Sequence, residues 1–70
     1  MKEGVLIYNP LNDRMAVRFG LNDFHEGLHC GTCLDVFINK RWKETRIEYG
    51  DGWYLVGIPT DRLDGLRVRM

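Results

Sequence analysis

Apolar and polar residues alternate along much of the chain, with the period of two that half-buried β-strands show. The pattern is clearest in residues 14–19, where Met15, Val17 and Phe19 alternate with polar or small residues. We expect these three side chains to face a core. The side chains on the other face of this segment are predicted to be exposed to solvent.

Turn-forming residues interrupt the alternation every eight to twelve positions, a spacing typical of small all-β barrels and sandwiches. The predicted strands cover residues 4–8, 14–19, 34–38, 41–49, 53–58 and 66–70. We expect a long irregular loop over residues 20–31, with room for a helical turn, and one helical or 3₁₀ turn over residues 59–63. Strongly bent strands in so short a chain can close on themselves and remove exposed sheet edges. The pattern predicts one domain, residues 1–70, built as a barrel of five or six short antiparallel strands.

The inward side of the later strands follows from the same parity. Its predicted core members are Leu34, Val36, Ile38, Ile47, Trp53 and Leu55. The turn at Asn39-Lys40 does not fit the commonest short hairpin, because a two-residue turn of type I′ would hold Lys40 at positive φ. A residue with a Cβ atom adopts that conformation reluctantly. We therefore expect a longer turn or a turn of another type.

Composition narrows the classes of function. The chain has 70 residues, and its ten Lys or Arg balance ten Asp or Glu, so no net field draws in nucleic acid or an acidic membrane. The apolar run at residues 4–8 is too short for a secretory signal or a membrane span. With only two cysteines and no export signal, we expect a cytoplasmic protein whose cysteines are thiols.

Four potential zinc ligands fall within nine residues: His25, His29, Cys30 and Cys33. A structural zinc site usually draws its ligands from two separate segments, whereas one continuous nonapeptide rarely surrounds a tetrahedral ion. We therefore expect no metal and no cofactor, and keep a zinc loop as an alternative. On the favoured interpretation Cys30 is a small buried residue, while Cys33 and both histidines are solvated.

Catalytic motifs are missing from the sequence. It contains no serine, no glycine-rich phosphate loop, and no helix start that would activate a Cys-x-x-Cys pair. A cysteine beside a histidine could form a nucleophile and base, for which Asp23 or Glu26 would be the orienting group, but the favoured interpretation of these acidic residues is a solvated loop. We therefore do not expect an enzyme.

Aromatic residues offer a better candidate site, because the chain has three Phe, three Tyr and two Trp, more than a small core holds. Strand parity turns Phe37, Trp42 and Tyr54 outward, and Arg46 shares the parity of Trp42. The Arg46 guanidinium could lie on the Trp42 indole ring at this outer face and so form a binding patch. The alternative is that Trp42 folds over one end of the barrel as a second small core.

Basic residues suggest a second binding hypothesis, for nucleic acid. They cluster around one hairpin and near the end of the chain: Lys40, Arg41, Lys43, Arg46, Arg67 and Arg69. Acidic residues lie among them, which is what any solvated barrel face looks like.

Several segments together resemble known proteins. Leu28-x-x-Gly31-x-x-Leu34-x-Val36, followed by Trp42 and by the Trp53-Tyr54-Leu55-Val56 run, is similar in layout to small SH3-like barrels. The segments GVLIY (4–8), LHCG (28–31), WKETRIE (42–48) and LDGLRV (63–68) more closely resemble the bacterial family called domain of unknown function 5348. The resemblance covers nearly the whole chain. It implies an SH3-like fold and no particular activity.

The sequence thus predicts a non-catalytic interaction module that binds a protein or peptide, or a second copy of itself, through Phe37, Trp42, Arg46 and Tyr54. Pairing between copies would use an unpaired edge strand, for which the first or the last strand is the candidate.

Overall fold

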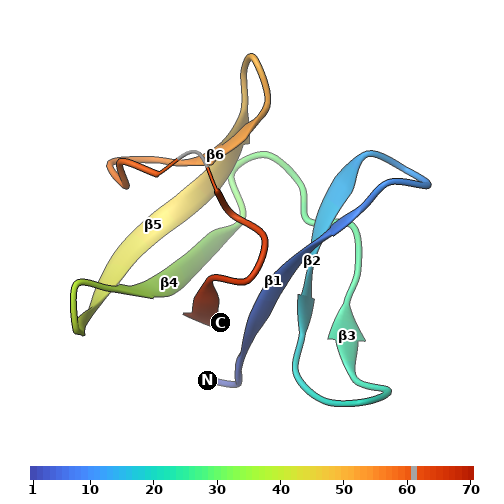
Figure 1. The fold of residues 1–70 in the computed structure, drawn as a ribbon, viewed down its shortest axis with the longest axis horizontal. Coiled ribbons are helices and arrows are strands. Elements are labelled where there is room, and N and C mark those ends of the chain that lie inside the picture. The colour runs from blue at the N-terminus through green and yellow to red at the C-terminus, as the bar shows by residue number, and fades with distance from the viewer. Residues whose placement is uncertain (61) are drawn as a thin grey trace.

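The computed structural model describes residues 1–60 and 62–70, and its strands form one antiparallel sheet (Figure 1). The sheet order is β3-β2-β1-β7-β4-β5-β6. The strands are β1 (Glu3–Asn9), β2 (Arg14–Arg18), β3 (Phe24–His25), β4 (Cys33–Ile38), β5 (Arg41–Tyr49), β6 (Trp53–Leu55) and β7 (Arg67–Arg69). The predicted all-β class is confirmed. Across the described residues no helix has the length and apolar character needed to span a bilayer.

The first and last strands are neighbours in the middle of the sheet, because β7 pairs with both β1 and β4. Backbone bonds continue this pairing to the ends of the chain: Lys2 N donates to Met70 O at 2.8 Å, and Met70 N donates to Lys2 O at 3.0 Å. The edges of the sheet are β3 and β6. Our expectation that the first or last strand would be an edge is therefore wrong.

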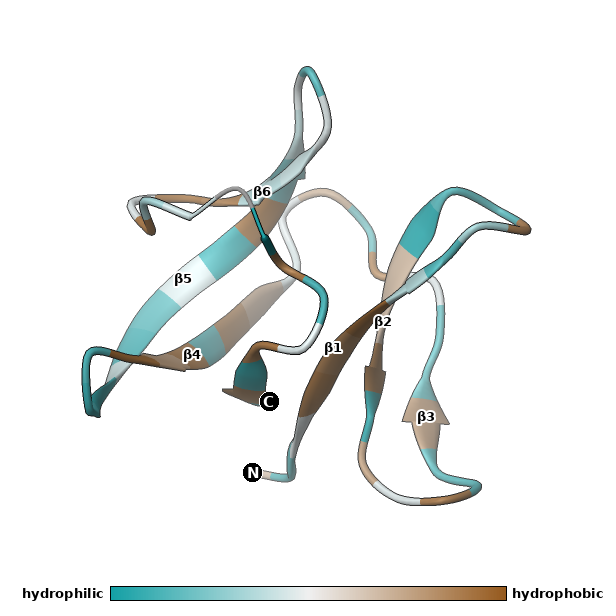
Figure 2. Ribbon diagram, in the orientation of Figure 1, coloured by the Kyte–Doolittle hydropathy of each residue, from teal (hydrophilic) through white to brown (hydrophobic). Residues whose placement is uncertain are grey.

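One apolar core lies inside the bend of the sheet, and its members occupy every second position along β2 and β4. Figure 2 shows apolar residues in brown along β1, β2 and β4. The buried cluster consists of Leu6, Met15, Val17, Leu28, Leu34, Val36, Ile47, Leu55, Ile58, Leu63 and Val68. Phe19, Ile38 and Trp53 pack against it while partly exposed, so the predicted parity is confirmed. Ala16 is also buried, although its parity predicted a wet position.

The sheet does not close into a continuous barrel, since no backbone ladder within residues 1–60 and 62–70 joins β3 to β6. A side-chain bond links the two halves instead, in which the Trp53 indole Nε1 donates to the backbone oxygen of Asp13 at 2.9 Å. Ile58 and Leu63 fill the core from the segment that follows β6. The fold is broadly consistent with an SH3-like barrel, but it is an open one.

The hairpin between β4 and β5 differs from our prediction. Asn39 and Lys40 have φ values of 53° and 65°, and the strands on either side pair Ile38 with Arg41. These are the features of the two-residue type I′ turn, whose backbone twist matches that of the flanking strands. The long β4–β5 register fixes the turn, so Lys40 accepts a conformation that its side chain disfavours.

Three other local predictions need correction. Residues 20–31 contain the short strand β3, with no helical turn. Strand β6 ends at Leu55 rather than continuing to residue 58, because the chain turns at Val56 and Gly57, where Gly57 has a φ of 75°. In the predicted helical turn, residues 59, 60, 62 and 63 are irregular, and Asp61 lies outside the described residues.

Candidate functional site

Phe37 and Trp42 lie side by side on the outer face of the sheet, as strand parity predicted. They are cross-strand partners in the β4–β5 ladder, and their ring centroids are 5.1 Å apart at an interplanar angle of 63°. Edge-to-face pairs of this kind are favourable beyond the area that they bury. Both rings are half-buried, and neither belongs to the core cluster. The alternative, in which Trp42 folds over one end of the barrel as a second small core, stays a prediction.

Two arginines of β7 complete this surface. The Arg67 guanidinium carbon lies 4.8 Å from the centroid of the Phe37 ring and 5.4 Å from that of Trp42. The Arg69 guanidinium carbon lies 4.3 Å from the Trp42 centroid. A cation over an aromatic face at such distances is attracted by the ring quadrupole. We call Phe37, Trp42, Arg67 and Arg69 the wall patch.

Each arginine of the wall patch is held in place by a carboxylate. Arg67 donates to both oxygens of Glu3, at 2.8 and 3.0 Å, and this bond lowers the pKa of Glu3 below its ordinary value. Arg69 Nε donates to Asp35 Oδ2 at 2.9 Å, and the Asp35 side chain is buried, with an exposed fraction of 8%. The wall patch is therefore electrically balanced and its cations are fixed over the rings.

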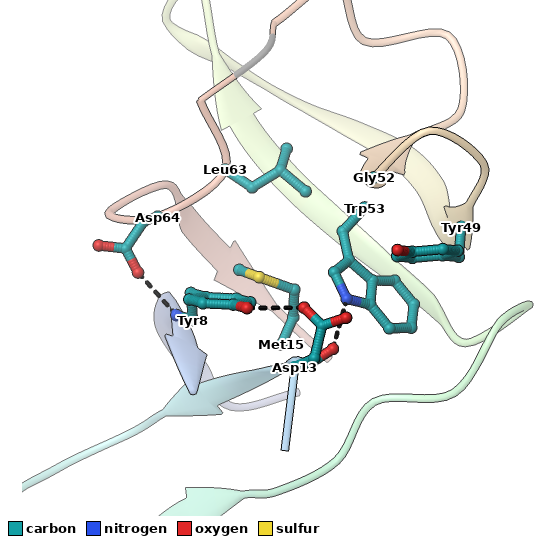
Figure 3. Close-up of a pocket in the computed structure, with 8 residues that line it drawn as sticks. All are labelled: Tyr8, Asp13, Met15, Tyr49, Gly52, Trp53, Leu63 and Asp64. Carbon is teal, nitrogen blue, oxygen red and sulfur yellow. Dashed lines mark hydrogen bonds between the residues drawn. The ribbon is translucent and has the colours of Figure 1, made fainter. Parts of the chain in front are cut away.

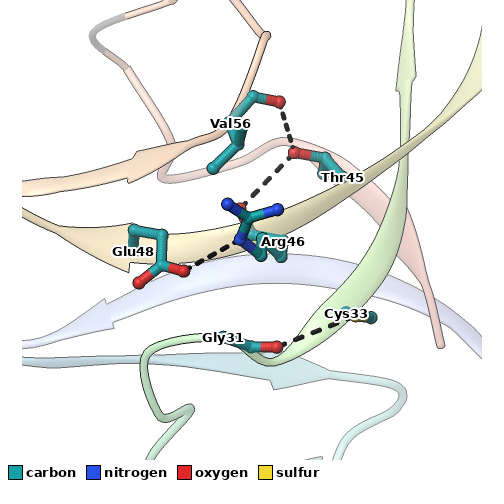
Figure 4. Close-up of polar contacts among 6 residues, drawn as sticks. All are labelled: Gly31, Cys33, Thr45, Arg46, Glu48 and Val56. Carbon is teal, nitrogen blue, oxygen red and sulfur yellow. Dashed lines mark hydrogen bonds and ion pairs between the residues drawn. The ribbon is translucent and has the colours of Figure 1, made fainter.

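Arg46 and Tyr54 do not join the wall patch, although the sequence grouped them with it. Arg46 Nε donates to Glu48 at 2.9 Å and has Cys33 as its cross-strand partner (Figure 4). Tyr54 is exposed on β6 opposite Glu48. The structure brings together Phe37 and Trp42 from the predicted set, and it supplies the cations from β7.

The basic residues of the nucleic-acid hypothesis do not share one face. Lys43 pairs with Val36, and Val36 pairs with Val68, so Lys43 has the inward parity of the sheet. Arg67 and Arg69 flank Val68 on β7 and face outward. Arg41 shares the parity of Lys43, and Lys40 lies in the turn. These cations therefore form no single stripe.

The four candidate zinc ligands are all exposed, and they are spread over β3, the loop that follows it and the start of β4. His25 is on β3 beside Val17, whereas Cys33 begins β4. No three His, Cys, Asp or Glu side chains in the described part of the chain are grouped to hold a metal ion. Cys30 is exposed rather than buried, which corrects our expectation for it. The Cys33 Sγ lies 3.7 Å from the backbone oxygen of Gly31 (Figure 4).

A second aromatic surface was not anticipated from the sequence. Tyr8, Tyr49 and Trp53 surround a cleft of about 320 Å³, which we call the aromatic cleft (Figure 3). The other residues that line it are Asp13, Met15, Gly52, Leu63 and Asp64. The Tyr49 and Trp53 rings pack edge to face with centroids 5.0 Å apart.

Hydrogen bonds fix the acidic side of the aromatic cleft. The Tyr8 hydroxyl donates to Asp13 Oδ1 at 2.6 Å, and the Tyr8 backbone N–H donates to Asp64 Oδ1 at 2.6 Å. The bond to the Asp13 carboxylate raises the pKa of Tyr8, since it favours the protonated phenol. The cleft therefore carries two carboxylates beside a phenol that stays neutral.

No local pattern in the sequence indicates this cleft, because its residues come from distant segments. The Trp53 indole and Asp13 are 40 positions apart in the chain. The pairing of Asp64 with Tyr8 spans 56 positions. Only the Asn9-to-Asp13 turn could have been marked in advance, through its Asn and Asp residues.

The fold and these surfaces define a small all-β domain with two aromatic surfaces. The family model described as Domain of unknown function (DUF5348) matches residues 4–70. The chain belongs to this family, and the resemblance seen in its sequence is confirmed. A crystal structure of a protein from Ruminococcus gnavus is similar, at 54% sequence identity and a TM-score of 0.93. The match covers 99% of this chain and 100% of that one. No curated protein matches the chain significantly.

Proposed function

We propose that this protein is a non-catalytic interaction module that holds a segment of a protein partner against the wall patch. The observation that supports it is the Phe37–Trp42 pair, whose rings are half-buried on the outer face of the sheet and lie outside the core. Aromatic and arginine side chains are also those that most often dominate binding energy at protein interfaces. None of the four members of the patch is a nucleophile or a general base.

The arginines leave hydrogen-bond donors for a partner. A guanidinium has five N–H donors, of which Arg67 directs two to Glu3, and Arg69 directs one to Asp35. Their other N–H groups can donate to backbone oxygens of a bound segment, while the rings contact its apolar side chains. Because the ion pairs already hold both guanidinium groups in place, little side-chain freedom is lost on binding.

The cytoplasm is the compartment that we propose for this module. Cys30 and Cys33 are exposed free thiols, which suit a reducing environment. In an oxidising compartment, exposed thiols are open to disulfide formation with other proteins.

The test removes the two rings with Phe37→Ala and Trp42→Ala together. Peptides are first selected from a random library on the wild-type protein, and their affinities are then measured by fluorescence polarisation. We expect the double variant to bind at least about tenfold more weakly, since loss of an aromatic hot spot costs roughly 2 kcal/mol or more. The matched control is Phe24→Ala with Tyr54→Ala, which removes two exposed rings outside the wall patch and should leave affinity unchanged.

Circular dichroism checks that each variant is folded. If the double variant unfolds, Arg67→Gln replaces it, because this change keeps both rings and removes one guanidinium. Equal affinities for wild type and variant would contradict the proposal. Sedimentation of the wild type over a range of concentrations shows whether the partner is a second copy of the chain.

A further inference from the structure

The aromatic cleft and the wall patch are separate surfaces. Trp42 lies near the start of β5 and Tyr49 at its end, seven residues further on. At about 3.3 Å per residue, the strand places them roughly 23 Å apart. A ligand can therefore occupy one surface without contacting the other.

The aromatic cleft has an apolar floor and two kinds of wall (Figure 3). Met15 and Leu63 are buried side chains that form the floor. Tyr8 and Trp53 stand on opposite sides of it, and Asp13 lies between their polar ends. Rings, a buried apolar floor and carboxylates within one cleft suit a ligand that is both flat and positively charged.

The charge of the aromatic cleft is not balanced from within. Asp13 and Asp64 each use Oδ1 to accept a hydrogen bond from Tyr8. Neither has an ion-pair partner among residues 1–60 and 62–70. Four other carboxylates of the described chain do have one: Glu3, Asp23, Asp35 and Glu48. Two uncompensated carboxylates at an aromatic surface attract a cation, and the second oxygen of Asp13 can accept its N–H groups.

The cleft is already formed before any ligand binds. The turn that carries Asp13 is fixed by side-chain bonds, in which Asn9 Oδ1 accepts from Leu11 N at 3.0 Å and Asn12 Oδ1 accepts from Arg14 N at 3.1 Å. Asp13 itself has a φ of 56°, which aspartate tolerates better than most residues. The Trp53 indole is anchored to the same turn.

A second depression of about 380 Å³ adjoins the first and shares Asp13, Tyr49 and Trp53 with it. It extends the surface toward Cys30. Two adjoining depressions with Trp53 in common to both suit an extended chain, which can place one side chain in each. A free cation would fill only the first.

We propose that the aromatic cleft binds an extended segment of a protein partner through an arginine of that segment, whose guanidinium lies against the ring of Trp53 and donates to Asp13, while Asp64 adds negative charge on the other side of Tyr8. Arginine fits this cleft better than lysine, because the planar guanidinium group both stacks on aromatic rings and forms paired hydrogen bonds with carboxylates. This site is additional to the wall patch and does not depend on it.

The two tryptophans make the test selective, because the indole N–H of Trp53 reports on the cleft and that of Trp42 on the wall patch. The probe is the blocked peptide Ala-Arg-Ala-Arg-Ala, titrated into ¹⁵N-labelled protein and followed by NMR. Its counterpart has citrulline, a neutral isostere, at both arginines. We expect saturable shifts of the Trp53 indole with the arginine peptide, much weaker shifts with the citrulline peptide, and a Trp42 indole that does not move.

The matching variant is Asp13→Asn with Asp64→Asn, which retains both Oδ1 acceptors for Tyr8 while removing two charges. Asparagine also tolerates the positive φ of residue 13. We expect the arginine peptide to bind this variant roughly three- to tenfold more weakly, as partly exposed charge pairs predict. Glu26→Gln with Glu44→Gln removes the same charge elsewhere and should leave binding unchanged.

Four results would overturn the proposal. Equal shifts with the citrulline peptide would show that the positive charge of arginine does not contribute to binding. An unchanged affinity in the Asp13 and Asp64 variant would remove the carboxylates from the site. Equal weakening by the control pair would reduce the effect to the overall charge of the protein. A shift at Trp42 alone would support the wall patch and contradict the cleft.

Discussion

Gly4 is the glycine at which the fold leaves least room for a side chain. It lies in β1, opposite Val68 of β7, and its Cα faces residues 17 and 18 of β2. A Cβ atom placed there would lie 2.8 Å from Val17 Cγ1, and nearer still to the backbone oxygen of Arg18. Carbon atoms pack at about 3.5–4.0 Å, so the overlap with Val17 is close to an ångström.

Neither neighbour can move freely. Val17 is fully buried, and Arg18 is held in register with Val5 by the β1–β2 ladder. Forcing a methyl group into a packed interior costs about 1–3 kcal/mol. A chain of this length is expected to have only roughly 4–10 kcal/mol of stability. We therefore expect Gly4→Ala to remove a large fraction of the free energy of unfolding and to lower Tm by about 4–8 °C for each kcal/mol.

The assay is urea unfolding followed by tryptophan fluorescence, with Gly20→Ala as the matched control. A Cβ at Gly20 meets nothing closer than Asp23 Cβ at 3.9 Å, so the same substitution should change stability by about 0.5 kcal/mol or less. If Gly4→Ala were as stable as the control, the close approach of β1 to β2 would be refuted. An unchanged m-value is expected, because the surface exposed on unfolding stays the same.

Two further predictions concern the core and the ion pairs. Leu55→Ala removes a buried core side chain and should cost about 2–4 kcal/mol, whereas Leu11→Ala, at an exposed turn, should be nearly neutral; similar unfolding curves would mean that β6 is misplaced. The bond from Arg67 lowers the pKa of Glu3 below its ordinary 4.5, so its stabilisation is present above that pH and is lost as pH falls through the lowered pKa. Glu3→Gln should therefore flatten the loss of stability in acid, measured by unfolding at a series of pH values. Glu26→Gln should not; an equally steep loss in both variants would count against the role of Arg67.

The long strands could be read from the sequence because their alternation is regular and their register is self-consistent. β5 begins and ends where the pattern predicted, and Ile47 is its buried member. β3 could not be predicted, since both of its residues are exposed and it exists through pairing with β2. Local preference also failed at Lys40, where the register of the hairpin outweighs the cost of a positive φ.

The candidate site shows the same division between local and distant information. Parity alone placed Phe37 and Trp42 on the outer face, because it depends on neighbours within one strand. The choice between Arg46 and the arginines of β7 depends on which strand lies beside β4. That neighbour is β7, some thirty positions away, and no local pattern indicates it. The aromatic cleft depends entirely on such contacts between distant segments, so no local pattern predicts it.

The pairing of Lys2 with Met70 makes the polypeptide nearly a ring, with its two ends side by side and running in opposite directions. A linker of a few residues would join them at little cost in loop-closure entropy, and new ends could then be opened at the exposed residues 20–22, between β2 and β3. The same geometry would let the domain be inserted into a surface loop of a host protein without separating the strands of that host. The arrangement of the sheet thus makes this fold well suited to circular permutation.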